Sequence, residues 1–82
     1  MDFVYVANRW YGEEHTILCA GLDGDQVFRE GVQIHRDQLV SAGLIDSEGT
    51  MDHEAALEAI RGYYGGYSGI EIVTVKWVGP LP

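Results

Sequence analysis

The N-terminal segment places the strongest constraint on the fold, because two β-prone runs flank a tight-turn sequence. Residues 3–11 are rich in β-branched and aromatic side chains, and a second such run follows at 15–22. Gly12-Glu13 between the runs suits a two-residue turn with glycine at its first central position. The pattern predicts an antiparallel hairpin, so we expect a domain built on an antiparallel sheet.

A second turn signal follows this hairpin. Asp23-Gly24 comes directly after the second run, and further β-prone residues occupy 26–34. Because Asp-Gly is a frequent two-residue hairpin turn, we expect a third strand there. The first part of the chain is thus predicted to be a three-stranded meander.

Two helices are predicted after the meander. Ala42-Gly43-Leu44 is typical of a helix end, with Gly43 at positive φ and Leu44 folded back on Leu39, and it predicts a short helix over 36–42. A second helix is expected over 53–64. There Asp52 caps the first turn, Glu54 lies near the positive end of the helix dipole, and apolar side chains recur on one face, namely Ala56, Leu57, Ile60 and Tyr64.

The last β-prone run, 70–78, predicts a C-terminal strand that ends before Gly79-Pro80. The expected fold class is therefore α+β, a single small domain over 1–82. It is an antiparallel β-sheet made of the three-stranded meander plus the C-terminal strand, in the order β-β-β-α-α-β, with helices packed on one face.

Two-residue turns set the expected register of the hairpins and so divide the side chains between two faces. The face expected under the helices carries Val4, Val6, Ile17, Cys19 and Phe28. The opposite face carries Phe3, Tyr5, Ala7, Leu18, Ala20 and Val27, and it is unusually apolar for a solvated face. Such a face favours contact with a partner. The alternative is that the strands pair in a different register, in which case these apolar side chains do not share an uncovered face.

Composition narrows the classes of function. In the 82 residues, 46% hydrophobic content favours a folded chain, while 13 acidic against 5 basic residues give a net charge of −8. This surface repels nucleic-acid phosphates, so direct nucleic-acid binding is not expected. The sequence has no charged leader and no long apolar run, so we expect no membrane contact and a cytoplasmic location.

The chain shows no set of side chains suited to catalysis. Cys19 is the sole cysteine, which excludes an internal disulfide, and His15, His35 and His53 fall in three different predicted elements. No metal-ligand spacing, catalytic set or cofactor motif follows from these positions. We therefore expect a non-enzymatic protein without a metal or cofactor, and a small enzyme is the alternative.

Two runs without lysine or arginine concentrate the negative charge. The first holds Asp46, Glu48, Asp52, Glu54 and Glu58, and the second holds Glu13, Glu14, Asp23 and Asp25. The first run is expected on a loop and one side of a helix, and the second at opposite ends of a strand. Such acids can imitate a nucleic-acid backbone and dock on a basic groove, or can form an ordinary solubilising surface.

Tyrosines near the end of the second predicted helix suit protein contact. Tyr63, Tyr64 and Tyr67 lie in a glycine-rich tract, and tyrosine offers a large contact area with a polar hydroxyl. The alternative is that Tyr63 or Tyr64 completes the core. Tyr67 and Tyr5 are therefore added to the acids as candidate partner-binding residues.

These observations lead to two hypotheses for the function. The first is a small acidic inhibitor or adaptor that binds the basic, nucleic-acid-binding surface of a protein partner. In size and charge the chain resembles small phage anti-defence proteins, including anti-CRISPR and anti-restriction inhibitors. The second is a homodimer or small structural subunit that joins through the apolar sheet face or a free sheet edge.

Overall fold

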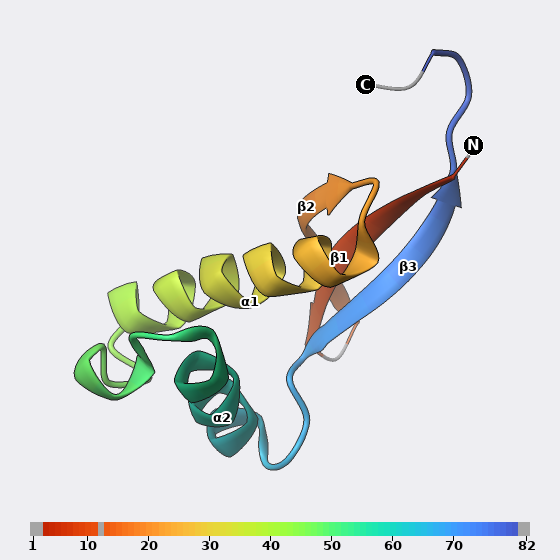
Figure 1. Cartoon of the computed structure of the whole chain (residues 1–82). Coiled ribbons are helices and arrows are strands. Elements are labelled where there is room, and N and C mark those ends of the chain that lie inside the picture. Colours follow the sequence, from red (N-terminus) through yellow and green to blue (C-terminus); the bar gives the residue numbers. More distant parts are fainter. Residues whose placement is uncertain (1–2, 12, 81–82) are drawn as a thin grey trace.

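The computed structural model describes residues 3–11 and 13–80, and these form an α+β domain with the order β-β-α-α-β (Figure 1). Gly12, which the sequence places in the first turn, lies outside the described residues. The elements are β1 (Phe3–Tyr11), β2 (Glu14–Gly21), α1 (Gly24–Ser41), the 3-10 helix η1 (Glu48–Thr50), α2 (His53–Tyr64) and β3 (Ile70–Lys76).

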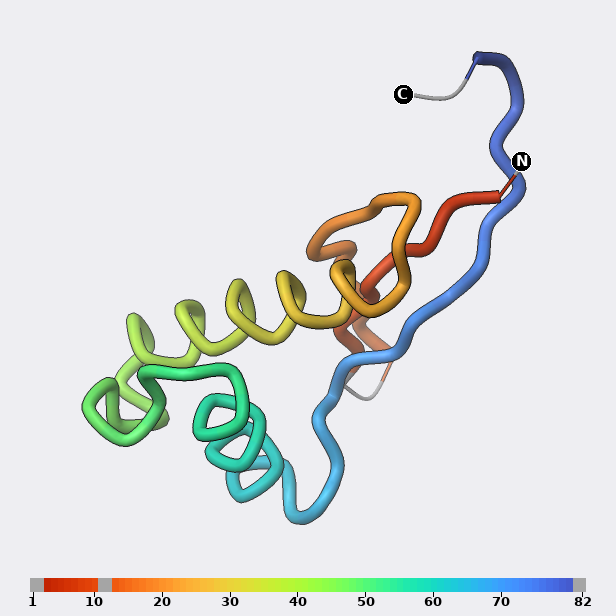
Figure 2. Tube along the Cα trace, viewed as in Figure 1, coloured from red at the N-terminus to blue at the C-terminus, as the bar shows by residue number. Residues whose placement is uncertain are grey.

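The sheet has three strands in the order β2-β1-β3, and both pairs are antiparallel. α1 crosses one face of this sheet, and α2 packs against α1 and η1 rather than against the strands (Figure 2). The two helices therefore share one side of the sheet, but only α1 covers it.

The predicted third strand at 26–34 is wrong, because these residues belong to α1. Asp23 does not open a hairpin. Its side chain accepts hydrogen bonds from the backbone N–H groups of Asp25 (3.0 Å) and Gln26 (3.3 Å), which caps the helix. The buried side chains Val27, Val32, His35 and Leu39 then recur at helical spacing.

The predicted helix over 36–42 is the last part of the same helix, and its end is as expected. Gly43 has a φ of 72°, its N–H donates to Val40 O (3.0 Å), and the N–H of Leu44 donates to Leu39 O (2.9 Å). This pair of bonds closes the helix end with glycine in the left-handed region.

The second predicted helix is confirmed at both ends. Asp52 accepts a hydrogen bond from the N–H of Ala55 (2.8 Å), and Gly65 ends α2 with a φ of 76°. The last strand is also confirmed, although it ends at Lys76 and not at residue 78.

A β-bulge changes the predicted register of the first hairpin. Near the turn the pairing is as expected, with Asn8 opposite Ile17, but Ala7 lies opposite Cys19 and Leu18 is the extra residue. Leu18 and Cys19 can therefore both approach α1, and each lies near Gly31. The period of two on which the face assignment rested does not hold across the bulge.

α1 covers the face of β1 opposite to the one predicted, so Val4, Val6 and Ile17 are not under the helices. Cys19 and Ala20, which lie beyond the bulge, keep their predicted sides. Tyr5 and Ala7 lie under α1, with the ring of Tyr5 next to Gly24, so Tyr5 is not on an uncovered face. Ile17 and Ala20 are exposed on the opposite side. We call that side the open face, and it comprises Val4, Val6, Asn8, Ile17, Ala20, Glu71, Val73 and Val75.

The main core lies between the sheet and the two helices. Its buried side chains are Ala7, Val27, Val32, Leu39, Ala56, Ile60 and Ile70. Val4 is also buried but lies on the open face, outside this cluster. On that face Ile17 is 64% exposed and Val75 is 44% exposed, so the sheet has a second apolar side that α1 does not cover.

Candidate functional site

Five of the predicted partner-binding acids lie together on the segment from the α1–η1 loop through α2. We call this surface the acidic end, and it comprises Asp46, Glu48, Asp52, Glu54 and Glu58. All five residues are exposed. The surface places five carboxylates on one end of the molecule, on the side away from the far end of β3 (Figure 1).

Backbone hydrogen bonds hold two of these carboxylates in place. Asp46 accepts from the N–H of Glu48 (2.9 Å), and Asp52 caps α2. Asp52, Glu54 and Glu58 also border one shallow hollow with Gly49, Ala55 and Ala59. Asp46 and Asp52 are thus fixed to the backbone of the loop and of the first turn of α2.

Arg36 contacts the η1 loop but forms no ion pair with the carboxylates of the acidic end. Arg36 donates to the buried Thr50 hydroxyl (3.1 Å) and to Ser47 O (3.5 Å), and it pairs with Asp37 (2.5 Å). This is the only ion pair within residues 3–11 and 13–80. The five acids therefore keep their charge without a cationic partner in the described chain.

The other predicted acids lie elsewhere, at opposite ends of β2 as expected. Glu13 and Glu14 are exposed at the hairpin end. Asp23 and Asp25 lie at the corner between β2 and α1, where they border a hollow with Tyr5 and Leu22. The structure does not join these residues to the acidic end.

Tyr67 lies near the β1–β2 hairpin end of the sheet and is not part of the acidic end. Its ring stacks on Trp10, with the centroids 5.5 Å apart and an angle of 22° between the planes. Tyr67 is 43% exposed, whereas Tyr64 is half-buried and packs on the core. The alternative in which Tyr64 completes the core is confirmed.

Tyr64 belongs to a polar network around His35. His35 is fully buried, with Nε2 2.8 Å from the Tyr64 hydroxyl and Nδ1 3.4 Å from Gln38 Oε1. Arg9 also donates to Gln38 Oε1 (3.5 Å). Burial lowers the pKa of His35, the hydrogen bond with Gln38 raises it in part, and the charge of Arg9 lowers it further.

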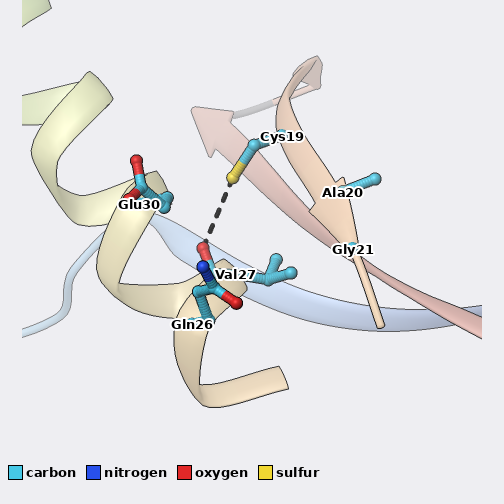
Figure 3. Close-up of a pocket in the computed structure, with 6 residues that line it drawn as sticks. All are labelled: Cys19, Ala20, Gly21, Gln26, Val27 and Glu30. Atoms are coloured by element: carbon cyan, nitrogen blue, oxygen red, sulfur yellow. Dashed lines mark hydrogen bonds between the residues drawn. The ribbon is translucent and has the colours of Figure 1, made fainter. Parts of the chain in front are cut away.

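A small pocket of about 190 Å³ lies between β2 and the first turns of α1 (Figure 3). Cys19 lines it, and its thiol donates to Val27 O (3.4 Å). Burial raises the pKa of the Cys19 thiol, and the negative charge of Glu30 raises it further. Both effects favour the protonated thiol, which is a poor nucleophile.

The sequence does not predict this pocket, because its pattern places Gln26 and Glu30 on a strand. No local signal links either residue to Cys19. Only the packing of α1 on β2 brings them together.

Within the described residues, no three His, Cys, Asp or Glu side chains gather in a way that could hold a metal ion. None of the described helices has the length and hydrophobicity needed to cross a bilayer. Comparisons with protein-family models, with curated proteins and with solved structures find no match.

Proposed function

We propose that this protein is a non-enzymatic interaction module whose acidic end docks on a basic surface of a protein partner. The observation that carries the proposal is the set of five carboxylates that no lysine or arginine of the described chain neutralises. Unpaired charge of one sign attracts an oppositely charged surface over long distances and speeds association.

The natural target of such a surface is a protein groove that binds nucleic acid. Grooves of this kind present lysine and arginine side chains for phosphate groups. Glu54 and Glu58 are one helical turn apart, a rise of about 6 Å along α2, and Asp52 borders the same shallow hollow as both. A carboxylate row on a rigid helix can thus occupy phosphate positions without the protein binding nucleic acid itself.

The proposed role is therefore that of an inhibitor or adaptor, of the kind found among phage anti-defence proteins. It places the protein in the cytoplasm, where its partner would bind nucleic acid. The protonated thiol of Cys19 supports a role without nucleophilic catalysis.

The test removes the charges of the acidic end while keeping its backbone hydrogen bonds. The variant Asp46→Asn/Glu48→Gln/Asp52→Asn/Glu54→Gln/Glu58→Gln retains an oxygen acceptor at both capping positions. Host proteins retained by the immobilised protein at low salt are expected to be lost with this variant. They should also be displaced from the wild-type protein by duplex DNA, because both ligands would occupy one site.

A matched control removes five charges from other surfaces: Glu13→Gln/Glu14→Gln/Asp25→Asn/Glu30→Gln/Glu71→Gln. This control has the same net charge and is expected to retain the captured proteins. Equal loss of binding in both variants would show that net charge alone is responsible. Retention in the presence of excess DNA would contradict the mimicry of nucleic acid.

A further inference from the structure

The outer edge of β3 carries unpaired backbone groups in a defined pattern. The N–H of Trp10 donates to Gly69 O (2.9 Å), and these residues continue the β1–β3 register. Because hydrogen bonding alternates along an antiparallel pair, the backbone groups of Glu71, Val73 and Val75 point toward β1. Those of Ile70, Ile72, Thr74 and Lys76 point away from the sheet.

Ser68 occupies one end of this edge. Its hydroxyl accepts a hydrogen bond from the N–H of Ile70 and donates to Ile70 O, each at 3.3 Å. For Ile72, Thr74 and Lys76, no hydrogen bond from the described residues reaches the outward backbone groups. The free edge is therefore a set of three alternate residues centred on Thr74.

The edge of β3 is better suited to strand addition than the edge of β2. β3 pairs with β1 over seven residues without a register shift, whereas β2 contains the bulge at Leu18. Natural sheets commonly protect their edges with bulges, prolines or inward-pointing charges. The strand 70–76 contains neither a bulge nor a proline, and its one charge on the covered face, Lys76, is exposed at the end of the strand.

We propose that this edge pairs with the same edge of a second copy, antiparallel, about a two-fold axis at Thr74. The axis sets Thr74 opposite Thr74 of the second copy, and Ile72 opposite Lys76 of the second copy. All three free residues of each copy then pair, in a ladder of about six hydrogen bonds. The product is one continuous sheet of two three-stranded halves.

The side chains fit a second copy in this register. On the open face, Val73 meets Val75 of the second copy, and on the covered face the two Thr74 side chains meet. No two like charges stand directly opposite. Parallel pairing in register would instead set Glu71 against Glu71 and Lys76 against Lys76.

Charge also favours self-association at this edge. β3 carries one acid, Glu71, and one base, Lys76, so the strand is neutral in a chain of net charge −8. Figure 1 places η1 and α2, which hold the acidic end, away from the C-terminal half of β3. Two copies can thus meet at β3 without bringing their acidic ends together.

One copy exposes more surface than a typical folded monomer of its mass, which leaves surface that a second copy can bury. The chain exposes 5393 Å², whereas a folded monomer of 9.1 kDa typically exposes about 4,900 Å². Its radius of gyration is 13.5 Å, against about 12 Å for a compact chain of 82 residues. Pairing at β3 would remove part of this excess.

The test combines oligomeric state with a charge exchange at the axis. Sedimentation of the wild-type protein at rising concentration is expected to show a species of twice 9.1 kDa. Thr74→Lys and Thr74→Glu each place like charges opposite one another, so each is expected to raise the dimer dissociation constant roughly tenfold. Mixing the two variants should restore a dimer, because the axis then pairs opposite charges.

Two further measurements separate this edge from other contacts. Amide exchange of Ile72, Thr74 and Lys76 should slow as the concentration rises. Ile17→Lys, on the open face, is the control and should still dimerise. A wild-type protein that is monomeric at all concentrations overturns the proposal, and so does a dimer that Ile17→Lys disrupts and Thr74→Lys does not.

The pairing of two copies at the β3 edge does not depend on the proposed binding of a basic partner by the acidic end. The five-substitution variant of the acidic end is expected to dimerise as the wild-type protein does. If that variant dimerises but no basic partner is captured, the proposed function fails and the pairing at β3 stands.

Discussion

His35 shows at the residue scale how a polar side chain can belong to a core. The imidazole is fully buried where α1, α2 and β1 meet. Its Nδ1 lies within hydrogen-bonding distance of Gln38 Oε1, and its Nε2 within hydrogen-bonding distance of the Tyr64 hydroxyl. With Gln38 Oε1 as acceptor, Nδ1 carries the proton and Nε2 accepts from the Tyr64 hydroxyl. The neutral ring is therefore satisfied, and a second proton would have to be accommodated in a buried site near Arg9.

This arrangement predicts a loss of stability on acidification. The pKa of His35 is lowered in the folded state, so below its ordinary value of about 6.5 the unfolded chain binds a proton that the folded chain does not. The free energy of unfolding should therefore fall as the pH drops below about 6.5 and until the folded pKa is reached. The slope contributed by one proton is at most about 1.4 kcal/mol per pH unit.

Denaturant titrations between pH 7.5 and pH 5 measure this slope. His35→Gln is expected to be less stable at pH 7.5 but to show a shallower dependence on pH. An unchanged slope in His35→Gln would assign the pH dependence to other groups.

At the scale of elements, α1 is the part of the fold that local signals misidentified. Asp23-Gly24 is compatible with a hairpin turn and with a helix N-terminus, because aspartate is favoured in both. Val27 and Val32 are β-branched, yet the buried positions 27, 31, 35 and 39 follow one another at four-residue intervals, which suits one face of a helix. The choice depends on α1 packing against β1 and β2, which a window of a few residues does not contain.

The contact between α1 and β1 depends on Gly31. A Cβ at this position would lie 2.9 Å from the Cβ of Ala7, which is too close without movement of the helix or the strand. Gly31→Ala is therefore expected to lower the free energy of unfolding by about 1–3 kcal/mol, less the roughly 1 kcal/mol that alanine adds to helix propensity. Chemical denaturation measures the net change.

Gly62 in α2 provides the matched control. No atom lies within 4 Å of a Cβ built at this position. Gly62→Ala is thus expected to raise the free energy of unfolding by about 0.5–1 kcal/mol through helix propensity alone. If both substitutions were stabilising, α1 would not be held as close to β1 as the structure has it.

At the scale of the whole molecule, net charge opposes compactness. The chain carries −8, and within the described residues only Arg36 and Asp37 form an ion pair. Screening lengths fall from about 30 Å to about 8 Å between 10 mM and 150 mM salt, while the longest extent of the molecule is 41 Å. Repulsion across the molecule is therefore substantial at low salt and weak at physiological salt.

We accordingly expect the melting temperature to rise between 10 mM and 150 mM NaCl, as measured by circular dichroism. The variant without the five charges of the acidic end should show a smaller rise, because less repulsion remains to be screened. A melting temperature that is independent of salt in the wild-type protein would mean that charge repulsion does not limit its stability.

Local chemistry alone determined several parts of this protein. The first hairpin, the end of α1 at Gly43, the whole of α2 and the final strand were predicted because turn glycines, capping aspartates and β-branched runs act over a few residues. The clustering of Asp46 to Glu58 was also predicted, since these acids are close in sequence.

Only the tertiary structure decided the remaining features. It makes 26–34 part of a helix, places the bulge at Leu18, sets α1 on the side of Tyr5 and Ala7, and brings Cys19 and Glu30 to one pocket. Each of these results depends on contacts between segments distant in sequence. The free edge at Ile72, Thr74 and Lys76 has the same origin, because it exists only once β3 has paired with β1.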